Sequence, residues 1–143
     1  MLLPITLTFA AAAALFNIWL GMRVSRLRMQ EKVLHGDGGS APLMRRMRAQ
    51  ANFIEYTPFV LILCGLVEMA LGSQDWLWGI ALVYILARVA HAFGMDAAKP
   101  HWARAGGIMV TMLVMLALAI AALYASYSGT RAIPAPPSLA ARA

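Results

Sequence analysis

Three polar side chains in an otherwise apolar segment are spaced to lie together on one face of a helix. Arg48, Asn52 and Glu55 are separated by four and then three residues, and residues at these spacings point from the same side of a helix. An ionised carboxylate inside hydrocarbon is costly unless it is paired, so charged residues in such a segment indicate a functional site. The alternative is an internal ion pair that only stabilises helix packing. The spacing alone leaves both interpretations open.

A second stripe of residues lies on one face of the third apolar segment. Tyr84, Arg88, His91 and Met95 follow one another there at intervals of four, three and four residues. If this helix runs antiparallel to the one before it, Arg88 lies at a depth comparable to that of Glu55. Each residue is then within about two to three turns of the cytoplasmic end of its helix. A single histidine is more often packed and hydrogen-bonded than a ligand. No second histidine or cysteine completes a metal-binding set, so we expect no metal.

The composition predicts an all-α membrane protein, because 62% of the 143 residues are hydrophobic and soluble domains contain roughly 45–50%. Four apolar segments are each long enough to cross a membrane as a helix, and they leave no room for a second domain. We therefore expect one four-helix domain over residues 1–130 and a flexible Pro/Ala-rich tail over residues 131–143. The expected spans are Leu2–Met22, Ala49–Leu71, Trp76–Phe93 and Ala105–Tyr127.

The formal net charge of +6 does not indicate a nucleic-acid partner, because the basic residues cluster beside the apolar spans. That placement favours membrane topology, lipid headgroups and an anionic ligand. By the positive-inside rule the connection between the first two spans is cytoplasmic, so both termini are expected in the periplasm. The single cysteine excludes an internal disulfide framework. Seven of the twelve basic residues lie in or beside this connection: Arg23, Arg26, Arg28, Lys32, Arg45, Arg46 and Arg48.

Local signals predict where the helices bend, end and carry other polar groups. The first helix is expected to continue out of the membrane through Arg23–Lys32 and to stop at Gly36–Gly39. Pro58 is expected to kink the second helix. Glu68, near the far end of that helix, is expected at the membrane interface. Arg104 stands at the start of the fourth span, where a simple role would be to anchor the helix among headgroups.

The second apolar segment resembles the signature of a known family. Arg48–Pro58 is similar to the R-A-x-x-N-x-x-E-Y-x-P motif of the MAPEG family, the membrane-associated proteins of eicosanoid and glutathione metabolism. Arg88–His91 resembles the R-x-x-[HY] element of the same family. Arg26–Gln30 and Gly36–Gly39 look more like its bacterial inner-membrane branch. The resemblance covers about Leu2–Tyr127, which is nearly the whole chain.

The resemblance implies a homotrimer of four-helix bundles that binds glutathione between protomers near the cytoplasmic surface. It also implies a role for individual residues, with an arginine at the start of the fourth helix activating the thiol. We include Arg26 of the first helix as a further candidate for binding glutathione. Arg26 or Arg28 is also the alternative group for activating the thiol. The implied glutathione-binding residues are Arg48, Asn52, Glu55, Tyr56, Arg88, His91 and Arg26, and the implied activating residue is Arg104.

Two positions depart from the family pattern. Met95 stands where some relatives have a second glutathione-contacting tyrosine, and His91 stands where those relatives have a tyrosine. The expected function is a glutathione-dependent transferase or peroxidase acting on lipophilic electrophiles or lipid hydroperoxides. Because the family includes a non-enzymatic lipid-binding protein, the alternative is a non-catalytic lipid-binding or scaffold protein of the same fold. A small transporter is less favoured, because no repeated or discontinuous helix pair is visible.

Overall fold

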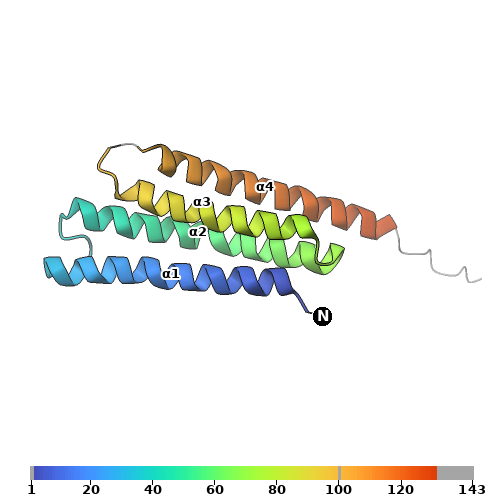
Figure 1. The fold of residues 1–143 in the computed structure, drawn as a ribbon, viewed down its shortest axis with the longest axis horizontal. Coiled ribbons are helices and arrows are strands. Elements are labelled where there is room, and N and C mark those ends of the chain that lie inside the picture. The colour runs from blue at the N-terminus through green and yellow to red at the C-terminus, as the bar shows by residue number, and fades with distance from the viewer. Residues whose placement is uncertain (1, 100, 132–143) are drawn as a thin grey trace, which may run out of the picture.

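Four long helices make up the computed structural model, which describes residues 2–99 and 101–131 (Figure 1). They are α1 (Pro4–Glu31), α2 (Ala41–Leu71), α3 (Asp75–Asp96) and α4 (Trp102–Arg131), and no strand occurs in this part of the chain. Each helix is long and apolar enough to cross a membrane. The expected all-α, four-span bundle is therefore confirmed, whereas the expected tail lies, from residue 132 onward, outside the described residues.

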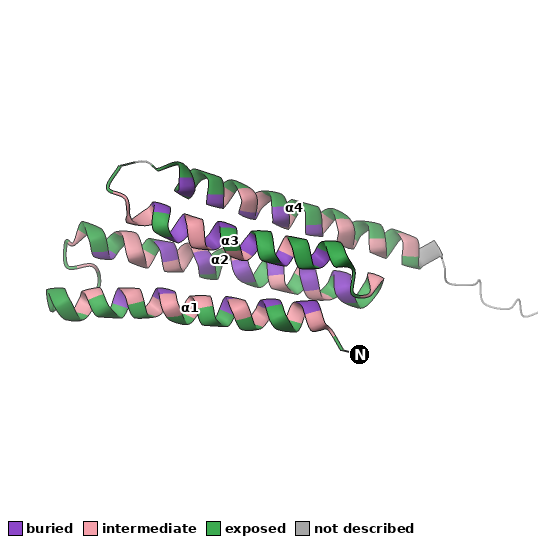
Figure 2. Ribbon diagram, in the orientation of Figure 1, coloured by how far each residue is buried: buried purple, intermediate pink, exposed green. Residues whose placement is uncertain are grey.

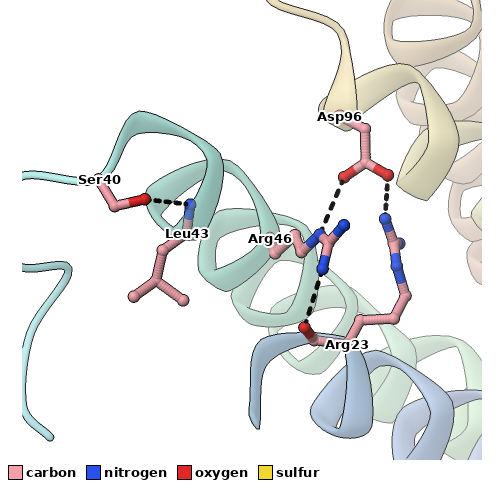
Figure 3. Close-up of polar contacts among 5 residues, drawn as sticks. All are labelled: Arg23, Ser40, Leu43, Arg46 and Asp96. Carbon is pink, nitrogen blue, oxygen red and sulfur yellow. Dashed lines mark hydrogen bonds and ion pairs between the residues drawn. The ribbon is translucent and has the colours of Figure 1, made fainter. Parts of the chain in front are cut away.

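The helix ends follow from local chemistry. α1 continues through the basic stretch to Glu31, as expected, and ends where Lys32 takes a left-handed conformation with φ of 56°. α2 begins before the expected span, because Ser40 caps it: the Ser40 hydroxyl accepts a hydrogen bond from the Leu43 N–H at 3.2 Å (Figure 3). α2 is assigned as one helix through Pro58. Neighbouring helices can compensate for the backbone hydrogen bond that a proline removes.

α2 and α3 lie in the centre of the bundle, with α1 and α4 on either side of them (Figure 1). Among the described residues, α1 and α4 are the one pair of helices without contact. Figure 2 shows buried residues gathered on the faces that the helices turn toward one another. The outer faces expose large apolar side chains such as Leu15, Leu82 and Leu123, which suits a bundle surrounded by lipid. The core is formed by Ile5, Phe9, Ala13, Leu20, Phe53, Val60, Cys64, Val67, Leu77, Ala81, Tyr84, Ala92, Val114 and Leu118.

An ion cluster joins three helices at the end of the bundle that carries the α1–α2 and α3–α4 connections (Figure 3). The Asp96 carboxylate accepts a hydrogen bond from Arg23 and lies 3.8 Å from Nε of Arg46. Arg46 also donates to the Arg23 carbonyl at 3.1 Å. The Arg23 guanidinium lies 4.5 Å from the centre of the Trp19 ring, a distance at which a cation–π contact adds to the ion pair. The cluster ties α1, α2 and the end of α3 together beside the α3–α4 connection.

Glu68 lies near the end of α2, where the sequence places it at the membrane interface, and its side chain is completely buried within the chain. One carboxylate oxygen accepts hydrogen bonds from the Ile5 N–H and the Ser73 hydroxyl, at 3.1 and 2.8 Å. The other accepts from the N–H and hydroxyl of Thr6, at 2.8 and 2.6 Å. Glu68 therefore accepts hydrogen bonds from N–H groups at the start of α1 that have no partner within the helix, and its charge is stabilised by the positive end of the α1 dipole. It ties the start of α1 to the end of α2.

Candidate functional site

A cavity of about 330 Å³ lies between α2, α3 and the start of α4, a volume within the range of small-molecule sites. Its walls carry two arginines, a carboxylate, an amide and two histidines beside apolar side chains. It lies toward the same end of the bundle as the ion cluster, since His101 of the α3–α4 connection forms part of its wall. The lining residues are Arg48, Ala51, Asn52, Glu55, His91, Met95, His101, Arg104, Ala105 and Ile108.

The polar face of α2 faces this cavity. Arg48, Asn52 and Glu55 all line it, which confirms the shared face that their spacing predicted. Glu55 is exposed, and the ion pairs of the described residues are those of Asp96 with Arg23 and Arg46. The alternative interpretation, in which Glu55 forms an internal ion pair, is therefore not what a single chain adopts. The Glu55 carboxylate is therefore available to a ligand in the cavity or to a neighbouring protomer.

Arg88 is buried behind the cavity and does not line it. The residue is 1% exposed, and its guanidinium donates hydrogen bonds to Oδ1 of Asn52 at 2.7 Å and to the Thr111 hydroxyl at 3.3 Å. The bond from Arg88 uses the carbonyl oxygen of the Asn52 side chain, so the amide NH₂ group is what Asn52 can still offer as a donor. Arg88 thus orients a cavity residue and links α2, α3 and α4.

His91 connects α3 to the backbone of α4. Its Nδ1 lies 2.9 Å from the carbonyl oxygen of Arg104. A carbonyl oxygen can only accept, so Nδ1 carries the proton, and in the neutral ring Nε2 is then an acceptor. Nε2 is buried and has no hydrogen-bond partner among the described residues. His91 therefore holds the first turn of α4 through Nδ1, and its Nε2 remains available as an acceptor for a ligand in the cavity.

The start of α4 brings Arg104 to the cavity. The Arg104 N–H donates to the His101 carbonyl at 3.0 Å, and the Ala103 N–H donates to Nδ1 of His101 at 3.1 Å. His101 therefore caps α4 with both its backbone and its side chain. Sequence reasoning did not assign His101 to the site. The signal that could have found it is its place just before a helix start, where capping residues occur.

The remaining candidates lie elsewhere in a single chain. Tyr56 is partly buried and Arg26 is exposed, and neither lines the cavity. In the stripe predicted on α3, Tyr84 is buried and shares a hydrogen bond of 2.8 Å with the Thr57 hydroxyl. Within residues 2–99 and 101–131, no group of three or more histidine, cysteine, aspartate or glutamate side chains is placed to hold a metal ion.

Comparison with known proteins gives one family and relatives from one species. The family model described as "MAPEG family" matches residues 6–124. The chain is 32% identical over 117 residues to "Inner membrane protein YecN" of Escherichia coli strain K12, an alignment that covers 81% of this chain and 88% of that protein. The protein of the same name from Escherichia coli O6:H1 strain CFT073 matches to the same extent.

Proposed function

The chain belongs to the MAPEG family and is an integral membrane protein, and from this premise we propose that it is a glutathione-dependent transferase or peroxidase. Its substrates would be lipophilic electrophiles or lipid hydroperoxides. The observation that carries the proposal is the cavity, in which Arg48, Asn52, Glu55 and Arg104 meet beside apolar side chains. The charged side chains of the cavity suit a water-soluble, multiply charged co-substrate, and its apolar side chains suit an apolar acceptor.

The charges of the cavity match those of glutathione. The tripeptide has two carboxylates, one ammonium group and one thiol. Arg48 offers a guanidinium for a carboxylate, where two parallel hydrogen bonds are possible. Glu55 offers a carboxylate for the ammonium group, and the Asn52 amide offers further donors. This assignment uses each polar residue that α2 contributes to the cavity.

Arg104 is the group proposed to activate the thiol. Only a few per cent of a free thiol is thiolate at neutral pH, and the thiolate is the nucleophile. A guanidinium beside the sulfur favours the thiolate, and the N–H groups at the start of a helix add to this field. Arg104 lines the cavity and lies in the first turn of α4. The thiol proton passes to water, and the thiolate attacks the electrophilic atom of the apolar acceptor, so that the new bond to sulfur forms as the bond to the leaving group breaks and that group departs with the electron pair. With a lipid hydroperoxide the thiolate attacks the outer oxygen, the O–O bond breaks to release the lipid alcohol, and a second glutathione reduces the sulfenic acid to give the disulfide and water.

The exposed carboxylate of Glu55 supports assembly with neighbouring protomers, and we propose the homotrimer that the family resemblance implies. Glu55 lies about two turns inside the expected membrane span of α2, which begins at Ala49. A carboxylate that faces lipid at such a depth is costly. A neighbouring protomer that covers this face of α2 would remove the carboxylate from lipid and close the cavity. Glutathione then enters from the basic end, which we place in the cytoplasm, and the apolar acceptor enters from the bilayer.

The proposal is tested by glutathione binding to the purified protein in detergent, measured by calorimetry. Glu55→Gln is expected to weaken binding at least tenfold while the melting temperature changes little, because Glu55 has no ion pair in the chain to lose. Glu31→Gln is the matched control, since Glu31 is exposed at the end of α1 and away from the cavity. Equal affinity in a folded Glu55→Gln protein would contradict the ligand role, and no binding by the wild type would favour a non-catalytic lipid-binding protein.

Arg104→Ala tests the activating group. Glutathione affinity is expected to stay within a few fold, whereas the thiolate absorbance near the ultraviolet edge disappears and turnover falls about tenfold or more. Arg104→Lys is expected to restore only part of the loss, because lysine supplies charge without the planar fork. If Arg104→Ala keeps the full thiolate signal, the activating group lies elsewhere, and Arg26 and Arg28 are the next residues to substitute.

A further inference from the structure

α3 and α4 approach each other too closely at Gly94 for any side chain to fit. A Cβ atom built on Gly94 would lie 2.3 Å from the backbone nitrogen of Arg104 and 2.8 Å from the carbonyl carbon of Ala103. Both neighbours are backbone atoms, which cannot rotate away as a side chain can. The backbone of Arg104 therefore rests directly on α3, at a position that only glycine permits.

A second glycine makes the reciprocal contact one turn further along α4. A Cβ atom on Gly107 would lie 2.5 Å from Cβ of His91 and 2.6 Å from the carbonyl oxygen of Ala87. The adjacent Gly106 differs completely, since a Cβ atom there would meet nothing within 4 Å. Gly94 of α3 and Gly107 of α4 thus lie where the two helices touch, whereas Gly106 does not, so position on the helix and not residue type distinguishes them.

The His91 hydrogen bond lies between these two contacts. Its Nδ1–H donates to the Arg104 carbonyl at 2.9 Å, so α3 holds both the nitrogen side and the carbonyl side of the same residue. Gly94 allows the approach, His91 sets the position of the carbonyl group, and Gly107 keeps the next turn in contact. Gly94 and His91 both meet the backbone of Arg104, and Gly107 packs against His91 itself.

We infer that Gly94, His91 and Gly107 are positioning residues that place the Arg104 guanidinium over the cavity. The inference rests on the proposed function, in which that guanidinium faces the glutathione sulfur. A long arginine side chain reaches a given point only if its backbone starts from the right place. Ordinary contact begins near 3.4 Å, so a methyl group at Gly94 displaces the start of α4 by about 1 Å, a shift that can cost on the order of a hundredfold in rate.

The placement of the other ligand contacts makes this inference distinguishable from a general loss of folding. Arg48, Asn52 and Glu55 belong to α2, and a shift confined to the first turn of α4, about two turns before Thr111, leaves them and the Arg88 contacts to Asn52 and Thr111 in place. A displaced α4 is therefore expected to lower the thiolate fraction and kcat while the affinity for glutathione is kept. A misfolded protein would lose glutathione binding as well.

The experiment compares Gly94→Ala with Gly106→Ala in the full-length protein in detergent. We expect Gly94→Ala to lower the thiolate absorbance at saturating glutathione and kcat at least tenfold, with the dissociation constant changed less than threefold. Gly106→Ala is expected to match the wild type in all three measurements, because its added methyl group meets no neighbour.

A pair of His91 variants keeps the inference testable if Gly94→Ala does not fold. His91→Asn retains a side-chain N–H that can donate to the Arg104 carbonyl, and we expect it to keep more of the thiolate signal than His91→Leu, which has no donor. Full thiolate and kcat in folded Gly94→Ala, or in His91→Leu, would overturn the inference while the wild-type signal upheld the proposed function. A wild type that binds no glutathione would overturn the proposed function itself, and this positioning role with it.

Discussion

Glu68 offers the sharpest test of what holds the bundle together, because its carboxylate accepts four hydrogen bonds while fully buried. Each oxygen serves one backbone N–H and one hydroxyl group: Ile5 and Ser73 on one oxygen, and both groups of Thr6 on the other. In Glu68→Gln an NH₂ group replaces one oxygen. Whichever oxygen is lost, one N–H and one hydroxyl face a donor instead of an acceptor.

The expected loss follows from this count. A hydrogen bond to a charged acceptor contributes about 1.5–3 kcal/mol, so two lost bonds cost about 3–6 kcal/mol before relaxation. The hydroxyl group can rotate away from the new NH₂ group, whereas the backbone N–H cannot. We therefore expect Glu68→Gln to lower the free energy of unfolding by about 3 kcal/mol, near the lower end of that range.

The assay is equilibrium unfolding in mixed micelles, combined with hydrogen exchange of the Ile5 and Thr6 amides. The matched control is Glu31→Gln, since Glu31 is exposed and surface changes stay within about 0.5 kcal/mol. Thr6→Val removes the 2.6 Å hydroxyl bond and completes a double-mutant cycle, for which we expect a coupling of about 1 kcal/mol. Stability within about 0.5 kcal/mol of wild type and unchanged exchange in Glu68→Gln would refute the reasoning.

Three further outcomes are expected. Asp96→Asn weakens the link of α3 to Arg23 and Arg46 and lowers stability by about 1 kcal/mol, because the cluster is partly exposed; urea or detergent unfolding with no change in midpoint would contradict this. His101→Ala removes one capping bond and speeds exchange of the Ala103 amide, at a cost of about 1 kcal/mol; unchanged exchange would show that the cap is dispensable. A C-terminal alkaline-phosphatase fusion is active and a C-terminal fluorescent fusion is dark, and the opposite pattern would reverse the proposed topology.

Features that depend on near neighbours in the chain could be predicted from the sequence. The four spans follow from apolar length, and the continuation of α1 through the basic stretch follows from local residue chemistry. The helix ends at Glu31, however, five residues before Gly36, the first of the glycines that were expected to stop it. The common face of Arg48, Asn52 and Glu55 follows from helical periodicity, which is a property of α2 alone. These predictions needed no knowledge of how one helix packs on another.

Features that depend on the rotation and axial offset of one helix against another were decided only by the tertiary structure. Glu68 lies more than sixty residues from Thr6 in the chain, and no local pattern indicates that the end of α2 meets the start of α1. Arg88 was expected at the depth of Glu55, yet its partner is Asn52 one turn away. The meeting of His91 with the Arg104 carbonyl requires the close approach at Gly94. Helical periodicity says which side of a helix a residue occupies, whereas the fit of two backbones decides which residues of the next helix it meets.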